Sequence, residues 1–279
     1  MRISSAIITA AGLGTRLLPY TKEIPKEMLP LIVRSNSSNL VIPVLHYIFE
    51  SLFKIGIRKF YLVVGRGKRV IEDYFTPEWS YVDFLYKSGK ADLAEILKQF
   101  YTMLEKCNIV MINQPSPRGF GDAVLRTRPV MTDSVFIVHA GDDLLFPDHV
   151  INIKRLVDHY ERYKPRIAFL VERSRTPEKY GVVIGEDKGD YIEVHDIIEK
   201  PRKPPTDLAV IAIYVFDKQI YNALEETRPT RGEHQLTDGI KYLLEKSEKV
   251  HAVKSVGTRI DVGTPDSYLE GLRYITTNR

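Results

Sequence analysis

The fold is decided by the stretch Ala10-Ala11-Gly12-Leu13-Gly14-Thr15-Arg16-Leu17-Leu18-Pro19, which Lys26-Glu27-Met28-Leu29-Pro30 follows closely. The mainly apolar residues 4–9 directly before it predict a short buried strand. A strand that opens into a glycine-bearing loop exposes backbone N–H groups, and such arrays of amides bind phosphate. Arg16 and Lys26 add two cations near the same place, one a planar fork and the other a point charge. The stretch therefore predicts a loop that binds phosphate.

Two common phosphate-binding loops do not fit this sequence. A Walker-type loop needs a lysine and a hydroxyl residue directly after its last glycine, whereas Thr15-Arg16 follows Gly14 here. A dinucleotide-binding loop needs a third glycine at the position that Leu17 occupies. What remains is a phosphate loop of another kind, or a tight turn with surface cations.

The whole run from Gly12 to Pro30 resembles the signature of the sugar-1-phosphate nucleotidyltransferases, and residues 26–30 are most similar to bacterial and archaeal UTP–glucose-1-phosphate uridylyltransferases. The resemblance implies an α/β, Rossmann-like fold with a mostly parallel mixed sheet flanked by helices. It also implies UTP and glucose 1-phosphate as substrates and Mg²⁺ as the cofactor. Arg16 and Lys26 take catalytic roles by the same resemblance. The implied nucleotide-binding residues of this region are Ala10, Ala11, Gly12, Gly14, Thr15 and Glu27.

The composition is that of an ordinary globular protein. The chain has 279 residues, of which 44% are hydrophobic and 27% charged, and this length is sufficient for a sizeable core. A net charge of +4 favours anionic ligands mildly, but no basic stripe with interleaved aromatic residues indicates a nucleic-acid surface. The single cysteine, Cys107, fits a reducing compartment. Because no signal-peptide core or membrane-length apolar run is present, we expect a cytoplasmic protein without membrane partners.

Strands and helices alternate along the first half of the chain, and this order predicts parallel units with right-handed crossovers. We expect helices over about 41–55, 66–75, 91–104, 123–131 and 147–163, and strands over 60–65, 109–113, 135–138 and 166–171. The apolar stripe of residues 91–104 predicts a crossover helix packed in the core. This segment also resembles one that uridylyltransferases have and the shorter thymidylyltransferases lack. Pro77 and Trp79 are expected in an irregular piece.

The strand over 109–113 leads into a loop that begins at Gln114. A primary amide has a donor and an acceptor on one edge, so Gln114 can match the N3–H and a carbonyl of uracil or thymine. It cannot distinguish those two bases, and an exposed loop amide is the alternative. The loop resembles the family's base-reading loop, which implies nucleotide-binding roles for Gln114 and Gly119.

Two aspartates are candidate metal ligands. Asp142 follows an apolar strand, and carboxylates at the carboxyl end of a central parallel strand project toward the ligand crevice of open α/β sheets. Mg²⁺ usually takes one or two carboxylates together with substrate phosphates. A turn or capping aspartate is the alternative. By resemblance, Asp142 fits the family's Gly-Asp-Asp metal position, Asp143 is the weaker candidate, and Asp261 resembles the family's second metal-binding aspartate.

The second half of the chain contains the candidate sugar-phosphate residues. Residues 180–184 and 191–198 predict a hairpin, and a strand is expected over 208–216. The segments Tyr-Gly-Val-Val and Glu-Lys-Pro resemble the family's sugar-phosphate site, which implies binding roles for Gly181, Glu199 and Lys200, the lysine also acting in catalysis. Glu233 is a candidate sugar contact, with a helix-start carboxylate as the alternative. Thr264 and Pro265 predict the start of a final helix.

We therefore expect a single domain over residues 1–279, with a nucleotide-binding part of about 1–145, a sugar-phosphate part of about 165–265 and a C-terminal helix of about 265–278. The expected reaction is uridylyl transfer from UTP to glucose 1-phosphate. The alternatives are a thymidylyltransferase, an enzyme that uses both dTTP and UTP, and a non-catalytic nucleotide or sugar-phosphate sensor. The resemblance also suggests a homodimer or homotetramer.

Overall fold

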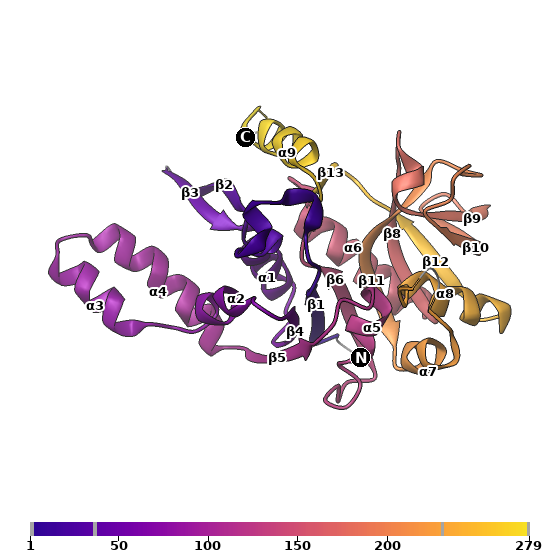
Figure 1. Ribbon diagram of the computed structural model, residues 1–279, viewed down its shortest axis with the longest axis horizontal. Helices are drawn as coiled ribbons and strands as arrows, with labels where there is room; N and C mark the ends of the chain where they lie inside the picture. The colour runs from indigo at the N-terminus through magenta and orange to yellow at the C-terminus, as the bar shows by residue number, and fades with distance from the viewer. Residues whose placement is uncertain (1–2, 36–37, 230–231, 278–279) are drawn as a thin grey trace.

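The computed structural model, which describes residues 3–35, 38–229 and 232–277, contains a nine-stranded sheet with the order β5-β4-β1-β6-β11-β8-β12-β10-β9 (Figure 1). Its strands are β1 (Ser5–Ala10), β4 (Lys59–Gly65), β5 (Asn108–Gln114), β6 (Val135–Ala140), β8 (Ile167–Arg173), β9 (Gly181–Asp187), β10 (Tyr191–Glu199), β11 (Leu208–Asp217) and β12 (Val250–Lys254). Two smaller sheets pair β2 (Pro30–Ser35) with β3 (Ser38–Pro43), and β7 (Asp143–Phe146) with β13 (Thr258–Asp261).

The first half of the large sheet is parallel, and antiparallel pairs appear in the second half. β5, β4, β1 and β6 run in one direction, so their carboxyl ends meet at the same edge. β11 is antiparallel to both β6 and β8, and β10 is antiparallel to β12. β9 pairs with β10 and also touches β11, which brings the β9–β10 hairpin toward the central strands. The expected Rossmann-like mixed sheet is confirmed.

Helices bury both faces of this sheet, which explains why its central strands are almost continuously apolar. Alternate side chains of β1 show the two layers, because Ile8 packs in one core and Ile7 in the other. The first core contains residues of α1 and α6, and the second contains residues of α5, α7 and α8. The helices are α1 (Val44–Lys54), α2 (Arg69–Tyr74), α3 (Trp79–Lys87), α4 (Ala91–Glu105), α5 (Phe120–Leu125), α6 (His149–Tyr163), α7 (Gln219–Glu226), α8 (Leu236–Glu245) and α9 (Pro265–Thr277). Within the described ranges, no helix is both long and apolar enough to cross a membrane.

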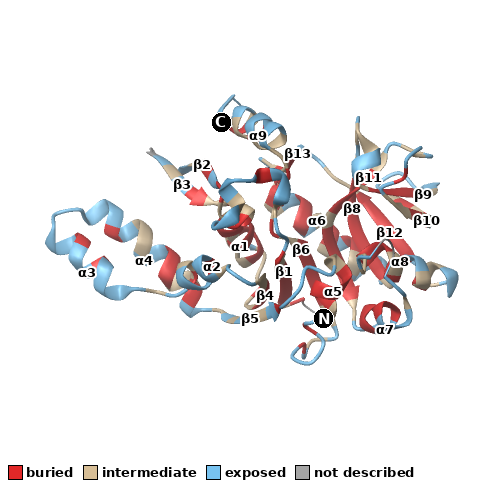
Figure 2. Ribbon diagram, in the orientation of Figure 1, coloured by how far each residue is buried: buried red, intermediate tan, exposed pale blue. Residues whose placement is uncertain are grey.

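The helices α3 and α4 form a hairpin that projects from the body of the molecule (Figure 1). The expectation of an irregular piece at Trp79 was wrong, because α3 begins there. Residues 91–104 are helical as expected, but Leu93 is 54% exposed while Phe100 and Leu104 are buried. The first part of α4 therefore packs in the core only along a narrow stripe that includes Ala94 and Leu97. It pairs with α3, and much of its remaining surface is exposed (Figure 2).

Several other boundaries differ from the expected ones. The helix expected over 123–131 lies earlier, at α5, and is followed by turns. The helix expected from residue 41 begins at Val44, because the residues before it extend into β3 and pair with β2. The final helix begins at Pro265, and Thr264 caps it by accepting a hydrogen bond of 3.2 Å from the Ser267 N–H. Residue 278 of the expected C-terminal helix lies outside the described part of the chain.

Two pairs of buried histidines join α6 to the sheet. Nε2 of His149 lies 3.1 Å from Nε2 of His139 in β6, and Nε2 of His159 lies 2.9 Å from Nδ1 of His251 in β12. Burial lowers the pKa of His139 and of His159 to about 4, and it also lowers the pKa of His149 and of His251. An N–H···N hydrogen bond needs an unprotonated nitrogen as its acceptor. At least one histidine of each pair must therefore be neutral.

Candidate active site

A cavity of about 580 Å³ opens where the loops after β1, β5 and β6 meet. This is the edge at which the carboxyl ends of parallel strands come together, and ligands of open α/β sheets bind at such edges. Most of the residues predicted from the sequence line it, namely Ala11, Gly12, Gly14, Thr15, Lys26, Glu27, Gln114, Gly119, Asp142, Glu199, Lys200 and Glu233. Ala10, Arg16, Gly181 and Asp261 lie outside this lining, and the latter two border neighbouring hollows.

The conformation of the loop after β1 depends on the backbone of Gly14 and on the side chain of Thr21. Gly14 has a φ of +65°, in the left-handed region, and a Cβ there would lie 2.9 Å from Cγ2 of Thr21. The hydroxyl of Thr21 donates a hydrogen bond of 2.8 Å to the Gly14 carbonyl. The short 3₁₀ helix η1 (Thr15–Leu17) then begins. Gly12 and Leu13 stay exposed at the rim of the cavity, as a phosphate-binding loop requires.

Lys26 and Asp142 form a partly buried ion pair inside the cavity. The Lys26 ammonium donates to Oδ2 of Asp142, and the two side chains are 16% and 17% exposed. Burial alone would lower the pKa of Lys26, but the charges of Asp142 and Glu27 outweigh it and raise that pKa. Burial likewise opposes ionisation of Asp142, and the Lys26 charge overcomes it and lowers the pKa of Asp142. Both groups are therefore charged at neutral pH.

Glu27 is the most buried of the predicted site residues that carry a charge. Its side chain is 1% exposed, and its Oε2 accepts a hydrogen bond of 3.0 Å from Nζ of Lys68. Lys68 follows β4 and is itself 9% exposed. The Glu27 carboxylate thus lies beneath the cavity, neutralised by Lys68, a residue that the sequence analysis did not single out.

Asp143, the residue directly after Asp142, forms a second buried ion pair. Nε and Nη2 of Arg259 donate to Oδ1 and Oδ2 of Asp143 at 2.8 and 2.6 Å, a bidentate pair whose side chains are 8% and 4% exposed. The Arg259 guanidinium also lies 3.9 Å from the ring centroid of Tyr180. Both carboxylate oxygens of Asp143 accept hydrogen bonds from Arg259, which explains why Asp143 is a weaker candidate metal ligand than Asp142.

Asp261 differs from Asp142 and Asp143 in forming no salt bridge with a residue of the described part of the chain. It lies opposite Asp143 in the β13–β7 pairing, and it accepts a hydrogen bond of 3.3 Å from the Tyr180 hydroxyl. Burial raises the pKa of Asp261 to about 6, and the charges of Asp143 and Asp142 add to this shift. The charges of Arg259 and Lys26 offset this shift only in part, and a bound cation would offset it further.

Asp142 and Asp261 fit the requirements of a Mg²⁺ site. The Val262 N–H donates a hydrogen bond of 2.9 Å to the Asp142 carbonyl, which ties the two segments together. Among the described residues no cluster of three or more His, Cys, Asp or Glu could hold a metal. Mg²⁺ usually takes one or two carboxylates plus phosphate oxygens, and Asp142 and Asp261 could supply two. A Cβ on Gly263 would lie 2.8 Å from Oδ1 of Asp261 and 3.1 Å from Nη2 of Arg16. Arg16 therefore reaches the Asp261 side of the site.

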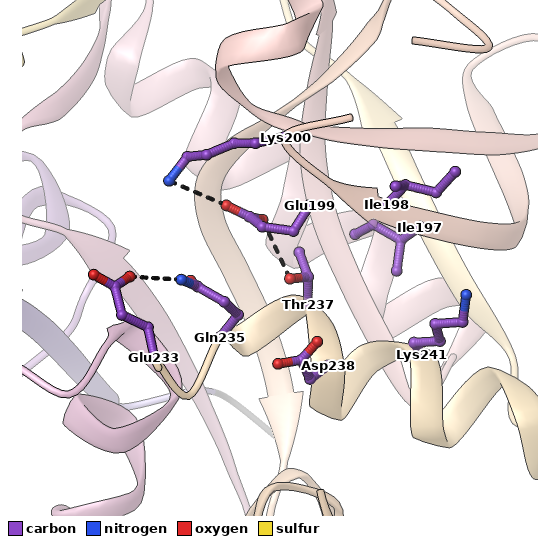
Figure 3. Close-up of a pocket in the computed structure, with 9 residues that line it drawn as sticks. All are labelled: Ile197, Ile198, Glu199, Lys200, Glu233, Gln235, Thr237, Asp238 and Lys241. Atoms are coloured by element: carbon purple, nitrogen blue, oxygen red, sulfur yellow. Dashed lines mark hydrogen bonds and ion pairs between the residues drawn. The ribbon is translucent and has the colours of Figure 1, made fainter. Parts of the chain in front are cut away.

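Of the predicted sugar-phosphate residues, Glu199, Lys200 and Glu233 line an adjoining pocket of about 430 Å³ (Figure 3). Oε2 of Glu199 accepts a hydrogen bond of 3.2 Å from the Thr237 hydroxyl, and Oε1 lies 3.3 Å from Nζ of Lys200. The Lys200 side chain is 54% exposed, so its ammonium is available to an anion. Glu233 accepts a hydrogen bond of 2.6 Å from the amide of Gln235.

Gly181 lines a neighbouring hollow together with Glu199 and Lys200, and little space remains there for a side chain. A Cβ there would lie 3.3 Å from Cγ2 of Thr237 and 3.4 Å from Oε2 of Glu199. Any larger residue would press on the glutamate that is proposed to contact the sugar.

The sequence model for nucleotidyl transferases matches residues 5–278, nearly the whole chain. The chain belongs to the nucleotidyl transferase family. It is 36% identical to the UTP–glucose-1-phosphate uridylyltransferase of Streptococcus pneumoniae serotype 4, an alignment that covers 96% of this chain and 89% of that one. It is 34% identical to the enzyme of the same name from Pseudomonas aeruginosa, with 98% and 95% covered.

Solved structures are similar to this nucleotidyl transferase over nearly their whole length. A UDP-glucose pyrophosphorylase complexed with UDP-glucose has a TM-score of 0.84 and 31% identity, and the match covers 99% of this chain and 100% of that one. A UTP-bound UDP-glucose pyrophosphorylase (UGPase) from Acinetobacter baumannii has a TM-score of 0.85 and 29% identity, with 99% and 94% covered.

In this nucleotidyl transferase, the loop after β5 is joined to the segment that carries Glu233. The Gly121 N–H donates to the His234 carbonyl at 2.8 Å, and the His234 N–H donates to the Arg118 carbonyl at 2.7 Å. The backbone at Gly119, whose φ is +106°, lies so close to that of His234 that a Cβ on Gly119 would be 2.5 Å from the His234 carbonyl oxygen. The predicted base-reading loop and the predicted sugar side therefore share one backbone connection.

We expect Arg259→Leu to lower the free energy of unfolding of this nucleotidyl transferase by about 3–5 kcal/mol, because Asp143 would remain buried without its cation. Urea unfolding monitored by circular dichroism measures the change. Arg173→Leu is the control: Arg173 pairs with Asp207 at the exposed surface, where an ion pair contributes less than about 1 kcal/mol. Equal losses in the two variants would contradict this role for the Arg259–Asp143 pair.

Proposed function

We propose that the protein transfers a uridylyl group from UTP to glucose 1-phosphate, forming UDP-glucose and pyrophosphate. The observation that supports it best is the single cavity that brings together the β1 loop, Lys26, Gln114, Asp142 and Lys200. Full-length similarity to uridylyltransferases and to structures holding UTP or UDP-glucose supports the same assignment.

In the proposed reaction, an oxygen of the sugar phosphate attacks the α-phosphorus of UTP in line with the departing pyrophosphate. The nucleophile is already anionic, so no general base is needed, and catalysis consists of positioning and charge neutralisation. Lys26 and Arg16 would stabilise the triphosphate, and Lys200 would hold the attacking phosphate against repulsion. Asp142 and Asp261 would hold Mg²⁺, which supplies further neutralisation of the phosphate charge when bound.

Two alternative functions are less well supported. Gln114 permits thymine as well as uracil, so a thymidylyltransferase or an enzyme that uses both dTTP and UTP is the nearest one. The extra segment that includes α4 and the sequence of residues 26–30 favour uridylyl transfer by resemblance. A non-catalytic sensor would not need Asp142, Asp261 and Lys200, all of which this chain has.

Pyrophosphate release from the purified protein with Mg²⁺ and glucose 1-phosphate tests the proposal across UTP, dTTP, ATP, CTP and GTP. A clear preference for UTP is the expected result, and a panel of sugar 1-phosphates then tests glucose against its epimers. Equal or better use of dTTP would move the assignment to thymidylyl transfer. No release with any nucleotide would favour the sensor.

We expect Lys200→Ala to raise the KM for glucose 1-phosphate by roughly 10- to 100-fold, the range for a hydrogen bond to a charged group, while the KM for UTP changes little. Initial-rate kinetics with each substrate varied in turn measure the two constants. Lys203→Ala is the control, because Lys203 is exposed near Lys200 but does not line the cavity. A rise confined to the KM for UTP would contradict the role given to Lys200.

The division into a nucleotide-binding part and a sugar-phosphate part stays a prediction, as do assembly into a homodimer or homotetramer and a cytoplasmic location without nucleic-acid or membrane partners. Light scattering after size-exclusion chromatography measures the mass of the assembly against the 32.0 kDa of one chain.

A further inference from the structure

The side-chain amide of Gln114 is held in one orientation. Its Nε2 donates hydrogen bonds of 3.1 Å to the Gly119 carbonyl and 2.7 Å to Oδ2 of Asp122. Both partners can only accept, so the –NH₂ end of the amide must face them and the carbonyl end must face away. Gln114 is 4% exposed but lines the cavity, and within the described residues no donor reaches its Oε1.

Asp122 is itself fixed. It lies in the first turn of α5 and is 8% exposed. Arg126, one turn later, donates to Oδ1 at 3.1 Å through Nη2 and approaches Oδ2 at 3.4 Å through Nε. Each carboxylate oxygen therefore accepts from a protein donor, and the carboxylate offers Gln114 no donor in return. Loss of the Gln114 contact would leave a buried charge-assisted hydrogen bond unmade.

We propose that Asp122 is a positioning residue for base selection: it makes Gln114 present only its carbonyl oxygen to the base. This inference rests on the proposed function, in which the cavity binds a uridine nucleotide. Uracil and thymine carry N3–H, which donates to a carbonyl oxygen, whereas N3 of cytosine is an acceptor and would meet Oε1 with like polarity. An amide free to rotate by 180° could offer –NH₂ to cytosine. The Gly119 carbonyl and Asp122 both oppose that rotation, and Asp122 opposes it more strongly because its hydrogen bond to Nε2 is shorter and charge-assisted.

The test replaces Asp122 by asparagine, which has the same shape but can face Gln114 with either an oxygen or an –NH₂ group. We expect the ratio of kcat/KM for UTP to that for CTP to fall at least about tenfold, because a site built around one polar pattern rejects the other strongly. The KM for glucose 1-phosphate should not change. Asp92→Asn is the matched control, since Asp92 occupies the first turn of α4 and is exposed.

A structural defect alone would lower activity with UTP and CTP by the same factor, and this result would overturn the proposal, as would an unchanged ratio. Asp122→Ser is a second variant in case asparagine is not accommodated, because a hydroxyl can donate or accept and frees the amide in the same way. The same loss of the UTP preference is expected from it.

Calorimetric binding of UTP and CTP separates this inference from the proposed function. If the wild-type protein prefers UTP in binding but turns over no nucleotide, the proposed function fails, and loss of the preference in Asp122→Asn still supports the positioning role. If the wild-type protein turns over UTP and the variant keeps its preference, the positioning role fails alone. Equal binding of UTP and CTP by the wild-type protein overturns the inference.

Discussion

Asp142→Asn is expected to lower kcat for pyrophosphate release by roughly a hundredfold or more, the loss typical of removing one electrostatic element that stabilises transition-state charge. The asparagine keeps the size of the side chain but removes the negative charge that Lys26 contacts and that a Mg²⁺ ion would bind. Steady-state kinetics over a range of Mg²⁺ concentrations measure the loss and any shift in the concentration required.

The Asp142→Asn result needs a control for charge and for folding. Asp266→Asn makes the same chemical change at an exposed position in the first turn of α9 and should leave kcat unaltered. Circular dichroism should show the same secondary structure for both variants. Near-normal turnover by Asp142→Asn at limiting Mg²⁺ would contradict the metal assignment.

The second large effect is a loss of stability in mild acid. The four histidines that join α6 to the sheet have lowered pKa values in the folded protein, whereas the unfolded chain has histidines near the ordinary value of about 6.5. Below that value protons bind preferentially to the unfolded chain. Stability is therefore fully present above about pH 6.5 and falls as the pH decreases toward the folded-state values, two of which are about 4.

The size of this loss follows from the number of groups. Each histidine that stays neutral in the folded state costs about 1.4 kcal/mol per pH unit below its unfolded pKa. His139 and His159, whose folded-state pKa values are about 4, therefore cost on the order of a few kcal/mol together by about pH 5, and His149 and His251 change stability in the same direction. Urea unfolding at a series of pH values measures the slope. The double variant His159→Gln/His251→Gln should show a shallower slope, and His195→Gln, which changes an exposed histidine, should not. A constant free energy of unfolding between about pH 7 and 5 would contradict the explanation.

Local sequence patterns predicted the parts of the fold that local interactions determine. The strand before Gly12, the helix over α6 and the hairpin of β9 and β10 each follow from residues that are close in sequence, with a clear periodicity or turn. The candidate phosphate loop follows from the sequence for the same reason, because its glycines and cations lie at fixed spacing along the chain. The family resemblance adds proposed roles for distant residues that no periodicity connects.

What the sequence did not predict depends on partners that are far apart along the chain. Asp143 and Arg259 are 116 positions apart, and only the pairing of β7 with β13 brings them together. The strands β7, β12 and β13 are short, and no local pattern marked them as strands. The stripe that begins at Leu93 was assigned to the core because periodicity identifies an apolar helix face but does not identify what covers it.

The backbone connection at His234 has a thermodynamic consequence. A ligand that orders the loop after β5 also restrains the segment carrying Glu233, because the two share hydrogen bonds at Gly121 and Arg118. Coupling between two binding sites is reciprocal, so the factor by which the nucleotide changes the affinity for the sugar phosphate must equal the factor by which the sugar phosphate changes the affinity for the nucleotide. If the two proposed sites are coupled through these hydrogen bonds, a substitution in one loop changes the affinity for both substrates.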